Sequence, residues 1–100
     1  IQNSKQRAYL RSLSNSVEPI FQVGKSSVTP DLITGIADAI AARELIKISV
    51  LNNCADDPKD IAQTIAERTR SEIVHVMGRK IVLYKQAKDP KKRKIELPIK

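Results

Sequence analysis

Two helix starts of the same kind most constrain the fold of this chain of 100 residues. Thr29-Pro30-Asp31 and Asp57-Pro58-Lys59 each place a capping side chain directly before a proline, which is favoured at the first helical position. Between these starts, residues 45–51 alternate apolar and polar side chains, and this pattern predicts a strand with one face toward a core. Such alternation of helix and strand is typical of α/β domains.

Three further apolar runs predict strands. Residues 20–23 form a short run that Gly24 ends, and residues 72–77 and 80–85 are rich in Val and Ile. Because only Gly78 and Arg79 separate the last two runs, we expect a tight hairpin there. We expect two helical crossovers, one from the strand at 20–23 to the strand at 45–51 and one from that strand to the strand at 72–77. Right-handed crossovers would make the strands that they join parallel neighbours, and the hairpin would add one antiparallel strand.

A helix is predicted at the start of the chain, over residues 4–14, with three side chains on its apolar side: Tyr9, Leu10 and Leu13. The predicted order is therefore α-β-α-β-α-β-β, with a mixed four-stranded sheet and packed helices. One hundred residues have room for one core, so we expect a single domain over residues 1–86. Residues 87–100 are rich in Lys, Arg and Pro, and we expect a basic, mostly solvated tail.

The charge of the chain favours a polyanion as its partner. The chain has eighteen Lys and Arg residues and eleven Asp and Glu residues, which gives a formal charge of +7. Residues 26–67 hold seven acidic residues against three basic ones, so the positive charge gathers toward both ends of the sequence. A scatter of solvated charges remains the alternative. Apolar stretches are short and broken by charges, and a single cysteine fits a reducing compartment, so we expect a cytoplasmic protein without a membrane span.

Residues suited to catalysis are few. Cys54 and His75 are the only candidates for a nucleophile and an imidazole, and neither lies in a recognisable motif. Asp57 stands beside Asp56, but its position before Pro58 explains it as a helix cap. One Cys and one His make a poor metal site. The sequence therefore predicts a protein that is not an enzyme, with no catalytic residues, metal or cofactor.

The loop Gly24-Lys25-Ser26-Ser27 is the most informative candidate for binding. It joins a predicted strand to the start of a predicted helix, where backbone N–H groups and the positive helix end favour an anion. Gly24 would let the backbone turn and approach a phosphate, while Lys25 adds a charge and the two serines add hydroxyl donors. RNA-binding KH modules use a GxxG loop in this way. An ordinary strand-to-helix turn is the alternative reading.

Two other basic features could extend this contact. Arg7 and Arg11 lie one turn apart on the polar side of the first predicted helix, where they could reach successive phosphates. Arg79 and Lys80 stand at the tip of the predicted hairpin. For both features, a solvated surface is the simpler alternative.

Four segments, taken in order along the chain, resemble the CRM domain family (chloroplast RNA splicing and ribosome maturation) in its stand-alone bacterial YhbY-like form: 5–11, 19–25, 42–48 and 78–84. The resemblance implies a fold similar to the C-terminal domain of bacterial translation initiation factor three. It also implies RNA binding and, for bacterial members, association with precursors of the large ribosomal subunit. The loop of the family commonly reads Gly-Lys-x-Gly, so Ser27 departs from it, and we expect more reliance on the other basic features.

Together these observations predict a monomeric RNA-binding protein that docks on structured ribosomal RNA during assembly of the large subunit. The residues expected to contact RNA are Lys5, Arg7, Arg11, Gly24, Lys25, Ser26, Ser27, Arg79 and Lys80. Few aromatic residues are available for base stacking, so backbone and shape readout is expected. A module that binds a ribosomal protein or an assembly factor is an alternative, and a nonspecific DNA-binding protein is a less favoured one.

Overall fold

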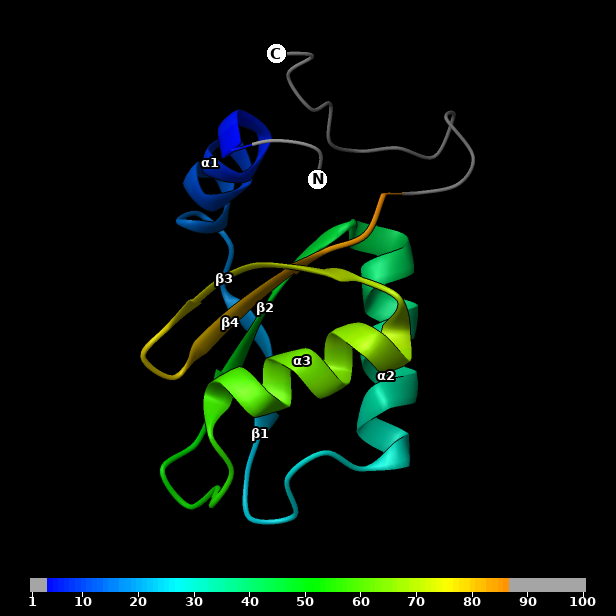
Figure 1. The fold of residues 1–100 in the computed structure, drawn as a ribbon. Helices are drawn as coiled ribbons and strands as arrows, with labels where there is room; N and C mark the ends of the chain where they lie inside the picture. Colours follow the sequence, from blue (N-terminus) through cyan, green and yellow to red (C-terminus); the bar gives the residue numbers. More distant parts are fainter. Residues whose placement is uncertain (1–3, 87–100) are drawn as a thin grey trace.

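Three helices and one four-stranded mixed sheet make up residues 4–86, the part of the chain that the computed structural model describes (Figure 1). The elements follow the predicted order: α1 (Ser4–Ser14), β1 (Pro19–Val23), α2 (Pro30–Arg43), β2 (Leu45–Val50), α3 (Pro58–Thr69), β3 (Glu72–Met77) and β4 (Lys80–Tyr84). The predicted α/β class and sheet are confirmed. The predicted tail lies outside the described residues.

Both predicted helix starts are present and capped as expected. The Thr29 hydroxyl accepts a hydrogen bond from the backbone N–H of Leu32 at 3.1 Å, and α2 begins at the following proline. The Asp57 carboxylate accepts one from the N–H of Lys59 at 2.8 Å at the start of α3. Each cap satisfies a backbone donor that the first helical turn leaves without a partner.

The sheet has the order β1-β2-β4-β3, which corrects one expectation. β1 and β2 are parallel neighbours, as predicted for a helical crossover. β2 and β3 are not neighbours, because β4 lies between them and pairs antiparallel with both. The cause is the unbroken apolar run of β4, whose residues 81–84 are all buried and therefore favour a central position covered on both faces.

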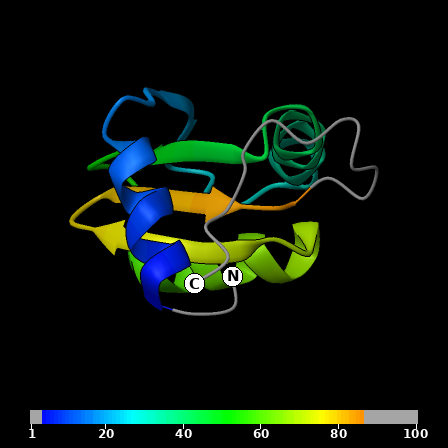
Figure 2. The same ribbon diagram turned by 90° about the horizontal axis from the view of Figure 1, so that it is seen from above.

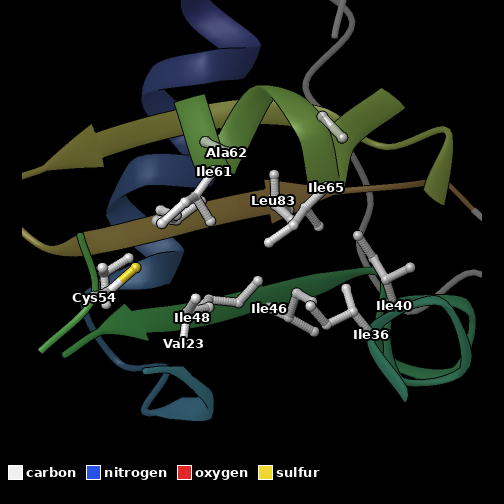
Figure 3. Close-up of a cluster of buried hydrophobic side chains, with 13 residues drawn as sticks. Val23, Ile36, Ile40, Ile46, Ile48, Cys54, Ile61, Ala62, Ile65 and Leu83 are labelled. Carbon is white, nitrogen blue, oxygen red and sulfur yellow. The ribbon is translucent and has the colours of Figure 1, made fainter. Parts of the chain in front are cut away.

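The main core lies between one face of the sheet and the helices α2 and α3. Ile46 and Ile48 of β2 and Leu83 of β4 point toward these helices (Figure 3). Ile36 and Ile40 of α2 meet them there, together with Ile61 and Ile65 of α3. These isoleucine and leucine side chains are almost fully buried, and their burial is the main source of stability of the fold.

The opposite face of the sheet carries α1, which lies across β2, β4 and β3 (Figure 2). Leu10 is fully buried there in a second cluster with four strand residues: Leu45, Val74, Val82 and Tyr84. Tyr9, which was predicted on the apolar side of this helix, is instead 39% exposed. The buried positions are Gln6, Leu10 and Ser14, each four residues apart, so the contact is a narrow stripe that turns Tyr9 outward.

Within residues 4–86, no helix has the length and apolar character needed to span a bilayer.

Candidate nucleic-acid interface

Three connections meet at one end of the sheet. The parallel strands β1 and β2 both finish there, and β4 begins there because it runs antiparallel to β2. The backbone N–H of Leu51, just after β2, donates to the Val23 carbonyl at the end of β1 at 2.8 Å. The N–H of Val50 donates to the Arg79 carbonyl of the hairpin at 2.7 Å. These bonds hold the loop after β1, the loop after β2 and the hairpin tip side by side.

This sheet end brings together two predicted basic features that lie far apart in the sequence. Lys25 and Ser26 are exposed in the loop after β1. Arg79 is exposed at the hairpin tip, where one guanidinium nitrogen donates to the Leu51 carbonyl at 3.1 Å. The guanidinium group has five N–H donors, so this bond fixes its position and leaves other donors for an anion. We call the surface formed by Lys25, Ser26 and Arg79 the sheet-end surface.

The loop after β1 takes its unusual backbone conformation at Ser27 rather than at Gly24. Ser27 has a φ of 54°, in the left-handed region, and its N–H donates to the Gly24 carbonyl at 2.9 Å. Gly24 is not among the residues with positive φ, so the left-handed position of this loop is at Ser27, and the predicted approach of a phosphate to Gly24 stays a prediction. The Ser27 hydroxyl donates to the Asp56 carboxylate in the neighbouring loop. Because this hydrogen bond occupies the donor, Ser27 holds the loop in place and offers less to a phosphate than predicted.

Two substitutions of Ser27 distinguish the contribution of its left-handed backbone to stability from that of its hydrogen bond to Asp56. Ser27→Ala keeps the left-handed residue and removes the bond to Asp56, so we expect the free energy of unfolding to fall by about 1 kcal/mol. Ser27→Gly also removes the bond, but glycine relieves a backbone cost of about 1 kcal/mol and should bring stability back near that of the wild type. Urea denaturation of the two variants measures the difference. Equal stabilities would show that Ser27 is not left-handed in solution.

The basic residues of α1 have different surroundings. One guanidinium nitrogen of Arg7 donates to the carbonyls of Ile73 at 2.6 Å and of Val74 at 3.2 Å. The pairing of β3 with β4 shifts register between Ile73 and His75, so Val74 is a bulged residue in the edge strand. Arg7 therefore fastens α1 to this edge. Lys5, like Arg7, is exposed on the helix.

Arg11 and Lys80 belong to a groove between α1 and the uncovered part of the sheet. Lys47 of β2 and His75 of β3 line the same groove. The sequence predicts Lys47 on the polar face of its strand, but no pattern in it connects Lys47 or His75 with the basic residues. The alternating pattern of residues 45–51 was the available signal for Lys47. Nothing in the sequence marks the bulge that places His75 on this face.

The residues considered for catalysis do not form a site. Cys54 is buried in the core on the side of α2 and α3, whereas His75 faces the groove beside α1, so the sheet separates them. Among residues 4–86, no group of three His, Cys, Asp or Glu side chains could hold a metal ion.

A small α/β domain with exposed lysine and arginine side chains at one end of its sheet defines a class of protein suited to binding polyanions. The sequence profile of the CRS1 / YhbY (CRM) domain matches residues 3–85, which is most of the chain. The chain belongs to this family, and the resemblance seen in the sequence is confirmed.

Relatives and a solved structure agree with this assignment. The "Probable RNA-binding protein YqeI" of Bacillus subtilis is 49% identical over 94 residues, which cover 94% of this chain and 96% of that protein. An "RNA-binding protein" of Haemophilus influenzae is 28% identical over 98% of this chain and 96% of its own. The solution structure of the hypothetical protein SAV1595 from Staphylococcus aureus superposes with a TM-score of 0.80. That protein is 46% identical, and the match covers 98% of this chain and 100% of the other.

Proposed function

We propose that this protein binds structured RNA through the sheet-end surface, and that its target is ribosomal RNA of the large subunit or its precursor. The observation that carries the proposal is the gathering of exposed Lys25 and Arg79 at one sheet end, from segments more than fifty residues apart in sequence. Relatives named as RNA-binding proteins support the choice of RNA over other polyanions. The large-subunit target follows from the family resemblance.

The contact is binding without turnover. Lys25 and Arg79 hold phosphates, and Ser26 adds a hydroxyl donor beside them. Lys80, Arg11 and Lys5 extend the positive surface toward α1, and Arg7 contributes mainly by fixing that helix on the sheet. The protein acts as a monomer in the cytoplasm and needs no cofactor.

A comparison of nucleic acids tests this function. The full chain is titrated against folded fragments of large-subunit ribosomal RNA and against duplex DNA of equal length at near-physiological salt. We expect the best RNA fragment to bind at least about tenfold more tightly than the DNA, because part of the contact depends on RNA shape. Equal affinities would identify a nonspecific DNA-binding protein. Binding to neither would favour a protein partner and would end the RNA proposal.

A further inference from the structure

The groove beside α1 has the size of a small-ligand site. It has a volume of about 390 Å³, and α1 forms one wall while β2, β3 and β4 form the floor. Ligand pockets span about 300–1,000 Å³, so the groove can hold one small group but not a helix. Figure 2 shows that α1 lies over only part of this face of the sheet.

Positive charge dominates the lining of this groove. Arg11 comes from α1, Lys47 from β2 and Lys80 from β4, and His75 adds an imidazole from β3. No acidic side chain is among the described residues that line the groove. Three separate elements each contribute a cationic side chain to the groove, and none contributes an anionic one. The groove is therefore complementary to a negatively charged ligand.

Two hydrogen bonds hold parts of this lining in place. The Lys80 ammonium donates to the Ser49 hydroxyl of the neighbouring strand at 2.9 Å, which holds it at the floor. The Ser14 hydroxyl donates to the Arg11 carbonyl at 2.6 Å, which closes the last turn of α1. The bulge at Val74 places His75 beside them. A preformed site loses less entropy on binding than one that must be ordered.

The groove also has an apolar side. Met77 of β3 lines it and is 65% exposed, the highest value among the exposed large hydrophobic side chains of the described chain, and Val82 and Ala8 lie beside it. A thioether side chain is flexible and packs well against flat rings. A ligand that fits this lining therefore has both an anionic part and an apolar, flat part.

The groove continues from the sheet-end surface. Lys80 follows Arg79 in the chain, and Arg79 is bonded to Leu51 beside the loop after β1. An RNA strand held at Arg79 therefore reaches the groove at the adjacent Lys80.

We propose that the groove takes a single unpaired nucleotide of the bound RNA, an inference that rests on the proposed function. Its phosphate lies against Arg11, Lys47 and Lys80, and its base packs against Met77. Paired bases are stacked inside a duplex and cannot enter a space of this size, whereas a bulged or looped nucleotide can be splayed out. The protein thereby prefers folded RNA with an unpaired nucleotide near its contact over a continuous duplex.

Two RNA hairpins test this inference, one fully paired and one with a single unpaired nucleotide in its stem. Fluorescence anisotropy with the full chain should show about fivefold tighter binding to the second hairpin, because packing of one base adds affinity. Lys47→Ala and Met77→Ala should each reduce this preference to less than about twofold. Arg43→Ala, at the exposed end of α2 away from the groove, is the matched control and should keep it.

A crosslink gives a second measurement. A 4-thiouridine at the unpaired position should crosslink to a peptide that carries Arg11, Lys47 or Met77. Equal binding of the hairpins, or a preference that survives both substitutions, would overturn the groove proposal. Weakening of both hairpins by Lys25→Ala would then still support the proposed function. If the wild-type protein binds neither hairpin and no ribosomal RNA fragment, both proposals fail together.

Discussion

The double variant Lys25→Ala, Arg79→Ala is expected to bind a large-subunit ribosomal RNA fragment about tenfold more weakly than the wild-type protein at near-physiological salt. Both side chains are exposed at the same sheet end, and each neutralises a phosphate in the proposed complex. Loss of two phosphate contacts should also reduce the slope of log affinity against log salt by about 1.5. Titrations at four or five salt concentrations measure both quantities.

A control with the same loss of charge decides whether position matters. Arg43→Ala, Arg68→Ala removes two exposed cations from the C-terminal ends of α2 and α3, at the opposite end of the sheet. We expect this control to change RNA affinity by less than about twofold, because distant charges are screened. Equal weakening by the two double variants would mean that net charge alone attracts the RNA and that the sheet-end surface has no special role.

Replacing Leu10 by alanine is expected to lower the free energy of unfolding by about 3 kcal/mol, within the range measured for buried leucines. Leu10 is fully buried and is the central contact of α1 with the sheet. For a domain of this size, such a loss lowers Tm by about 15 °C. Thermal unfolding followed by circular dichroism measures the shift.

Leu13→Ala provides the comparison for this second prediction. Leu13 lies on the same helix but is only partly buried at the margin of the cluster, so we expect a loss of about 1 kcal/mol. The Leu10 variant should also bind RNA more weakly at temperatures below its Tm, because α1 carries Arg11 and forms one wall of the groove. Similar stabilities of the two variants would contradict the assigned role of Leu10 as the main attachment of α1.

The order and boundaries of the elements could be predicted because their signals are local. Thr29 and Asp57 each cap the helix that follows, and a capping side chain before proline depends on few other residues. Gly78 and Arg79 likewise define the hairpin, and Gly78 has the positive φ that such a turn requires. Signals of this kind can be recognised without knowing the rest of the fold.

Contacts between distant segments could not be predicted in the same way. The insertion of β4 between β2 and β3 depends on which strand buries most apolar surface, and that is decided by the whole sheet. The bond from Arg7 to the edge of β3 depends on a bulge with no sequence signature. For the same reason, the sequence alone does not connect Lys47 and His75 with Arg11, because that proximity depends on where α1 lies on the sheet.

The loop after β1 likewise contains a contact between distant residues that could not be predicted from the sequence. Its four residues could be recognised as a candidate anion site, but the partner of Ser27 lies in another loop, at Asp56. A serine in a left-handed conformation is uncommon, and its hydroxyl bond to Asp56 helps to stabilise that conformation. The family pattern has glycine at this position, and glycine has no hydroxyl group, so the pattern does not predict the hydrogen bond to Asp56.

Sedimentation of the native protein from a cell lysate through a sucrose gradient, with and without ribonuclease, tests the central claim most directly. If the protein docks on large-subunit ribosomal RNA, it will migrate with the large subunit or with a lighter precursor, and ribonuclease will shift it to the top of the gradient. Protein that stays in the free fractions at moderate salt before any ribonuclease is added would contradict the claim.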